Sequence, residues 1–166
     1  MKKLLVAAAI GLTAFATPAM ATAGATFNVT ANVNAFCTTV TGSTTDLGFG
    51  TLTVGADGKL TGSYSASSTQ ANVVCNGANT TVTASSTAMT NSATLTDATN
   101  FTNTINYTPT VSLGTHSIVV DNAPHAVGEV VGTLTVGAGT LAPAGGKALL
   151  AGSYAGAIVV TLTPTA

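Results

Sequence analysis

The side chains with the greatest catalytic potential in this 166-residue chain are two histidines, two cysteines and five carboxylates. His116 and His125 do not have the spacing of a metal-binding motif. The acidic residues occur singly between predicted turns, so no pair of carboxylates for acid–base chemistry is indicated, and Asp57 and Asp121 are typical of turns. We therefore predict no enzyme active site, no metal site and no cofactor.

Two short runs resemble catalytic motifs only superficially. Residues 152–156 (GSYAG) look like a nucleophile elbow around Ser153, but the glycine spacing is wrong and the run opens a predicted strand instead of a helix. Residues 136–139 (VGAG) lack the full pattern of a phosphate-binding loop. A hydrolase would also need a base and an orienting group beside its nucleophile, and the two histidines do not supply them.

The first 21 residues have the organisation of a secretory signal peptide. Lys2 and Lys3 precede an apolar run from residue 4 to residue 16, and Ala19-Met20-Ala21 is a typical cleavage site. No later apolar run is long enough for a transmembrane helix, so we expect no membrane span after cleavage. The sequence thus predicts an exported protein.

Cys37 and Cys75 are the two cysteines. An exported chain enters an oxidising compartment, where two cysteines form a disulfide. Two thiols without a histidine at ligand spacing make a poor metal site, and a catalytic thiol would need positively charged neighbours. We therefore predict a Cys37–Cys75 disulfide.

Charged residues make up only 5% of the chain, and all four basic residues are lysines. Without a basic patch we expect no nucleic-acid partner and no attraction to anionic lipid. Threonine, serine, asparagine and glycine replace charges, which leaves strand edges without their usual protection against association. Disorder is the alternative for such a composition, but regular alternation of apolar residues argues for a packed core.

Alternation with a period of two recurs along the chain between glycine, asparagine, aspartate and proline, which predicts one antiparallel β-sandwich or barrel. Its first strand has Phe27, Val29, Ala31 and Val33 on one face. Further strands are expected near residues 36–40, 59–65, 70–75, 80–84, 100–111, 115–120, 127–136 and 153–163, with a bulge at Gly50, a two-residue turn at Asp57-Gly58 and a long loop over 137–152. The last strand has Tyr154, Ile158, Val160 and Leu162 facing inward.

The order of several short motifs resembles the spore-coat-U-like pilins of archaic chaperone–usher systems. These motifs are residues 27–31 (FNVTA) before Cys37, residues 47–52 (LGFGTL), residues 72–77 (NVVCNG), and a terminal strand that runs from residues 152–154 through residues 159–163. Two features depart from that family. The usual tyrosine-rich segment is missing between Ala84 and Val127, and the chain ends in Pro164-Thr165-Ala166 instead of an aromatic residue.

The resemblance implies an immunoglobulin-like sandwich that lacks one strand and is completed by a donor strand. Residues 1–21 would be the signal peptide, residues 22–34 the donor segment and residues 35–166 the pilin domain. Phe27, Val29, Ala31 and Val33 would be the plug, and Tyr154, Ile158, Val160 and Leu162 would belong to the acceptor groove. The implied partners are a periplasmic chaperone, an outer-membrane usher and neighbouring subunits of a surface pilus.

Two alternatives remain open at this point. The first strand could pair within its own domain, as first strands do in most sandwiches. The protein could also be a secreted glycan-binding adhesin or another monomeric β-sandwich module. The chain has no tryptophan, a residue that sugar-binding surfaces commonly expose, and this favours the structural subunit over the adhesin.

Overall fold

The computed structural model describes residues 28–38 and 46–166, and it separates residues 1–32 from the domain formed by residues 33–166. The predicted signal peptide and Phe27 lie outside the described residues. Within the described ranges, no helix has the length and apolarity that a membrane crossing requires.

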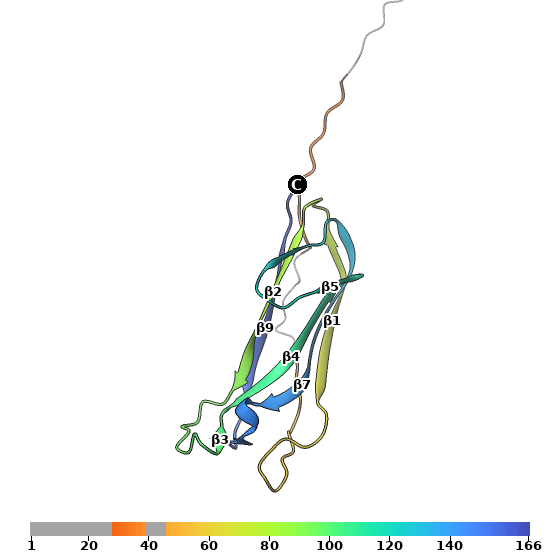
Figure 1. Cartoon of the computed structure of the whole chain (residues 1–166). Helices are drawn as coiled ribbons and strands as arrows, with labels where there is room; N and C mark the ends of the chain where they lie inside the picture. Colours follow the sequence, from red (N-terminus) through yellow and green to blue (C-terminus); the bar gives the residue numbers. More distant parts are fainter. Residues whose placement is uncertain (1–27, 39–45) are drawn as a thin grey trace, which may run out of the picture. The chain divides into compact units, whose positions relative to one another are not determined.

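The described domain consists almost entirely of β-strands, as Figure 1 shows. They are β1 (Ser65–Cys75), β2 (Thr81–Thr90), β3 (Phe101–Thr102), β4 (Thr104–Leu113), β5 (His116–Ile118), β6 (Pro124–Ala126), β7 (Val130–Pro143), β8 (Ala148–Leu149) and β9 (Ala155–Thr163). A single 3-10 turn, η1 (Ala144–Gly146), separates β7 from β8 in this part of the chain.

Seven of these strands form one curled antiparallel sheet, a half-barrel. The order is β1-β7-β4-β2-β6, with β5 paired to the end of β4 and β9 paired to β2 along most of its length. The strands β3 and β8 form a small separate parallel pair. The strand content confirms the prediction of an all-β, mainly antiparallel fold, and β1 and β9 are the two long strands at the edges of the sheet.

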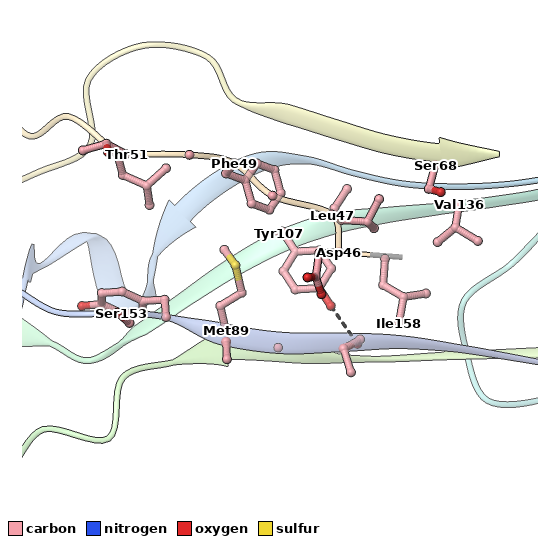
Figure 2. Close-up of a pocket in the computed structure, with 18 of the residues that line it drawn as sticks. Asp46, Leu47, Phe49, Thr51, Ser68, Met89, Tyr107, Val136, Ser153 and Ile158 are labelled. Carbon is pink, nitrogen blue, oxygen red and sulfur yellow. Dashed lines mark hydrogen bonds between the residues drawn. The ribbon is translucent and has the colours of Figure 1, made fainter. Parts of the chain in front are cut away.

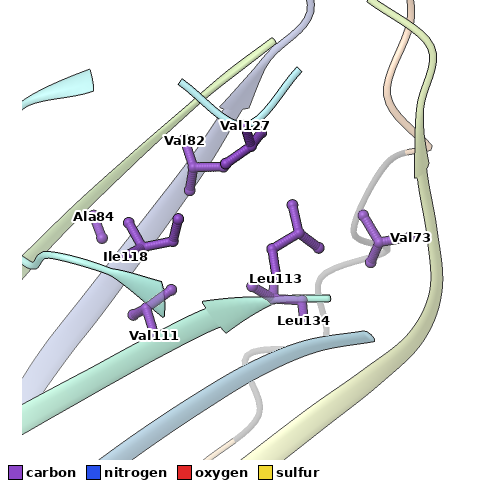
Figure 3. Close-up of a cluster of buried hydrophobic side chains, with 8 residues drawn as sticks. All are labelled: Val73, Val82, Ala84, Val111, Leu113, Ile118, Val127 and Leu134. Carbon is purple, nitrogen blue, oxygen red and sulfur yellow. The ribbon is translucent and has the colours of Figure 1, made fainter. Parts of the chain in front are cut away.

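The core lies on the concave side of this sheet, where aliphatic side chains from five strands and one loop meet (Figure 3). Its members are Val73, Val82, Ala84, Val111, Leu113, Ile118, Val127 and Leu134. Burying one such valine or leucine side chain contributes about 1.5–3 kcal/mol. Polar atoms at this depth are satisfied: the hydroxyl of the buried Thr80 donates to the carbonyl oxygen of Gly77 at 2.7 Å.

The predicted loop over residues 137–152 is wrong in its first half, because β7 continues to Pro143 and β8 follows at Ala148. At least one of the glycines that suggested a loop, Gly137, stands where there is little space for a side chain. A Cβ on Gly137 would lie 2.6 Å from the hydroxyl oxygen of Thr110 on the neighbouring strand. A glycine inside a strand here marks a close approach of another strand and not a chain break.

Two strands expected at residues 59–65 and 70–75 are replaced by the single strand β1, which starts at Ser65. Its register against β7 shifts between Gln70 and Val73, where Asn72 has a positive φ of 61°. This irregularity lies inside the second expected strand, and residues 66–69, which the prediction left between the two strands, belong to β1. Strand β2 extends six residues beyond the predicted end at Ala84, to Thr90.

The turn at Asp57-Gly58 exists but is wider than predicted. The Gly55 amide donates to the Lys59 carbonyl oxygen at 2.8 Å, and a side-chain oxygen of Asp57 accepts from the Lys59 amide at 3.1 Å. Gly58 has positive φ and Asp57 does not, so a two-residue turn with positive φ at both positions is excluded. Gly50 also has positive φ, but no strand is assigned there and the predicted bulge is absent from this described segment.

Candidate functional site

A partly open groove of about 1250 Å³ lies between β1 and β9 (Figure 2). One wall is formed by residues 68–70 of β1 and the other by residues 155–160 of β9. The floor contains Leu134, Val136 and Ala138 from β7 together with Met89 and Tyr107. The groove is therefore long, walled by strand edges and largely apolar at its base.

The β9 wall shows strict alternation. From Ile158 onward all three residues 158–160 line the groove, but Ile158 and Val160 are half-buried and pack against the core, whereas Val159 between them is 55% exposed. Tyr154 lies just before the strand, also lines the groove, and donates its hydroxyl hydrogen to the Leu150 carbonyl oxygen at 2.7 Å. Three of the four predicted groove residues thus come together.

Leu162 differs from the other three predicted residues. It is half-buried and packs against the core cluster, but it does not line the groove. It pairs with Val82 in the ladder between β9 and β2. The inward orientation predicted for it is correct, and its environment is the core beyond the end of the groove.

Tyr107 is a groove residue that the sequence analysis missed. Its hydroxyl lies 2.9 Å from the Thr87 carbonyl oxygen and 2.9 Å from the Ala157 carbonyl oxygen. Burial raises the pKa of this hydroxyl above its ordinary value of 10.0. The available signal was an aromatic side chain among threonines and asparagines, because an aromatic ring gains more from burial than these small polar side chains do.

Residues 46–54 form a further part of the lining and lie in the groove without belonging to a strand. Leu47, Phe49 and Leu52 are half-buried, while the residues between them are exposed. A Cβ on Gly48 or Gly50 would meet no atom within 4 Å, so this segment is not tightly packed on its outer side. The half-buried positions thus change phase after Gly50, from the odd positions 47 and 49 to the even position 52.

The groove-facing edges of both walls have few main-chain partners in the described structure. Strand β9 pairs with β2 alone, and the second edge of β1 is paired only at its end, where Cys37 forms a bridge with Cys75 and the Thr38 amide donates to the Val74 carbonyl oxygen at 2.7 Å. Edge strands present rows of backbone donors and acceptors that another strand can pair with.

The disulfide prediction is confirmed, since Cys37 is bonded to Cys75. The predicted first strand is not formed by the described part of the donor segment, because residues 28–36 carry no strand assignment. Val29 and Val33 are 94% and 76% exposed, and Ala31 is exposed as well. Their role as a plug remains a prediction.

The residues considered for catalysis are dispersed. His125 lies 2.8 Å from the carboxylate of Asp121 in the turn before β6, and this hydrogen bond is the main reason that the pKa of Asp121 lies below its ordinary value. His116 is on β5. Ser153 lines the groove, but neither histidine does, and the described residues contain no cluster of three metal-ligating side chains.

No protein-family model matches this chain, and no curated protein or solved structure matches it either. The function is therefore argued from the groove and its edges.

Proposed function

We propose that this protein is the structural subunit of a surface fibre, a pilin of the spore-coat-U-like class, whose groove receives a strand from a neighbouring copy. The main support is the combination of an apolar floor with two strand edges that face it. A β-strand is the ligand that fits both features, because its main chain pairs with the edges while its alternate side chains fill the floor.

The donor segment of this chain has the required pattern. Phe27, Val29, Ala31 and Val33 alternate with asparagine and threonine, so an extended strand presents one apolar face. Its six residue steps span about 20 Å. Because the period is two, a slip of one residue would turn the polar face towards the floor, and the register is therefore strongly specified.

On this proposal the curled sheet is an immunoglobulin-like sandwich that lacks one strand and is completed from outside. Residues 1–21 direct export, a periplasmic chaperone occupies the groove first, and the donor segment of the next subunit replaces it at the outer-membrane usher. The scarcity of charge suits this role, since strand association is then unopposed by edge lysines and glutamates. The assembled product is a pilus on the cell surface.

Gel electrophoresis and electron microscopy of the chain from residue 22 test the proposal. We expect heat-resistant ladders and thin filaments from this chain, and monomers from a variant that starts at residue 35. That shortened variant should bind a synthetic peptide of residues 22–34. A stable, strictly monomeric chain from residue 22, together with no peptide binding by the shortened variant, would overturn the proposal.

A further inference from the structure

Asn76 makes three hydrogen bonds to residues 34–36, which join the donor segment to the domain and are called the donor root below. Its side-chain oxygen accepts from the Phe36 amide at 2.6 Å, its side-chain nitrogen donates to the Asn34 carbonyl oxygen at 3.1 Å, and its own amide donates to the Phe36 carbonyl oxygen at 3.0 Å. The Asn76 side chain thus supplies residues 34–36 with the acceptor and donor that the main chain of a neighbouring strand would supply. The Cys37–Cys75 disulfide follows directly, so the root is fixed on both sides of Phe36.

The loop of residues 76–79 also holds the other end of the domain. The Asn79 amide donates to the Thr165 carbonyl oxygen at 3.1 Å, and the Asn79 side chain donates to the Ala166 carbonyl oxygen at 3.3 Å. A Cβ on Gly77 would lie 2.6 Å from the Thr165 carbonyl oxygen, which shows how closely the chain ends approach this loop. The donor root and the residues that follow β9 therefore meet at one loop.

The chain direction at Cys37 determines how the donor segment could enter the groove of its own domain. Residues 46–52 and Val54 line the groove, and Cys37 and Thr38 run antiparallel along the end of β1, away from this loop, where Cys37 pairs with Cys75 and the Thr38 amide donates to the Val74 carbonyl oxygen. A donor segment entering the same groove would have to form a hairpin with that part of the chain, with its reversal near residues 34–36. No turn or bend is assigned there.

We propose that Asn76 is a positioning residue that prevents this reversal, so that the donor segment inserts into a second copy of the chain and not into its own groove. Forming the hairpin would break the bonds that Asn76 makes to Asn34 and Phe36. The disulfide fixes Cys37, and the Asn76 amide holds the Phe36 carbonyl oxygen; the Asn76 side chain adds the bonds to the Phe36 amide and the Asn34 carbonyl oxygen that a reversal would have to break. This inference rests on the proposed function.

Three substitutions in the chain from residue 22 separate the role of Asn76 from a general effect on the loop. Asn76→Ala removes both side-chain bonds, and Asn76→Asp keeps the acceptor for the Phe36 amide but loses the donor to Asn34. Asn79→Ala is the matched control, because it removes a side-chain bond in the same loop without touching the donor root.

Hydrogen exchange reports the clamp independently of assembly. We expect the Phe36 amide to exchange about tenfold faster in Asn76→Ala than in the unsubstituted chain, the factor that one hydrogen bond of ordinary net strength represents. In Asn76→Asp and Asn79→Ala the Phe36 amide should remain protected. Equal exchange in Asn76→Ala and the unsubstituted chain would show that Asn76 does not hold the root.

Ladder formation and peptide binding then test whether the donor segment enters its own groove. We expect Asn76→Ala to give a severalfold larger fraction of monomers that neither form ladders nor bind the peptide of residues 22–34. Removing residues 22–34 from the same variant should restore peptide binding, which shows that the groove is intact and was filled by its own donor segment. Ladders as abundant as those of the unsubstituted chain, or the same monomers from Asn79→Ala, would overturn the inference. Failure of the proposed function differs, because the chain lacking residues 22–34 would then not bind the peptide even with Asn76 present.

Discussion

The hydroxyl of Tyr107 on β4 lies 2.9 Å from the carbonyl oxygen of Ala157 on β9, and so connects the floor of the groove to its wall. The same hydroxyl is 2.9 Å from the Thr87 carbonyl oxygen on β2. The register between β2 and β9 is irregular from Thr87 to Thr90, and Tyr107 supplies a partner for backbone carbonyls where the ladder is interrupted. The shape of the groove therefore depends on a side chain at its base.

Replacing Tyr107 by phenylalanine removes only that hydroxyl. We expect the free energy of unfolding to fall by about 1 kcal/mol, because the hydrogen bonding of one hydroxyl to the Thr87 and Ala157 carbonyl oxygens is lost. Urea denaturation measures this change. An unchanged midpoint at an unchanged slope would show that the contact does not stabilise the fold.

The alternation along β9 predicts unequal losses of peptide affinity when adjacent residues are replaced. Ile158→Ser removes an apolar side chain from the groove, and we expect the affinity for the peptide of residues 22–34 to fall at least about tenfold, within what an isoleucine side chain contributes by burial. Val159→Ser changes a side chain that borders the groove but is 55% exposed and does not pack against the core, and it should lower the affinity much less. Titration of the chain lacking residues 22–34 measures both values, and equal losses would exclude a specific inward face.

The donor peptide should show the same parity. Val29→Asp places a charge against the apolar floor, and we expect it to abolish detectable binding, since an unpaired buried charge is strongly unfavourable. Thr30→Asp places the charge on the solvent side and should bind within a few fold of the original peptide. If Thr30→Asp were the more damaging change, the register of the donor strand would be shifted by one residue.

The disulfide closes a loop with a sequence separation of 38 residues between Cys37 and Cys75. Replacing both cysteines by serine should lower the free energy of unfolding by about 4 kcal/mol on the chain-entropy model. Chemical denaturation of the oxidised chain and the double variant gives the difference. A loss below about 1 kcal/mol would indicate that the unfolded chain is already constrained in this region.

Acid should weaken the fold partly through Asp121. Its pKa is lowered first by the hydrogen bond from His125 and next by the Ala123 amide. A carboxylate whose pKa is lowered by folding stabilises the protein above its ordinary pKa, and this contribution disappears as the pH falls through the folded value. Asp121→Asn should therefore be less stable than the unsubstituted chain near neutral pH and should match it well below about pH 4. Urea midpoints over this range test the expectation, and parallel profiles would contradict it.

The sequence predicted the β-class and the alternating faces well, because a period of two is a local property. It placed Ile158 and Val160 inward and paired Cys37 with Cys75, and all of these features are confirmed. The prediction was wrong where one residue type is compatible with two kinds of structure. Gly137 was interpreted as part of a loop, although it lies inside β7. A glycine suits this position because a Cβ would lie 2.6 Å from the Thr110 hydroxyl oxygen. Such crowding depends on a strand that is distant in sequence.

Local chemistry, then, is what the amino-acid order determined by itself: one disulfide and strands with one apolar face, beside the expectations of an export signal and of no catalytic spacing among the histidines and carboxylates. The tertiary structure decided which strands become edges and what lies between them. The curl of the sheet leaves β1 and β9 on either side of one groove, brings Tyr107 to Ala157, and places Asn76 against residues 34–36. These relationships arise from strand order and twist, which act over the whole chain, and no local pattern encodes them.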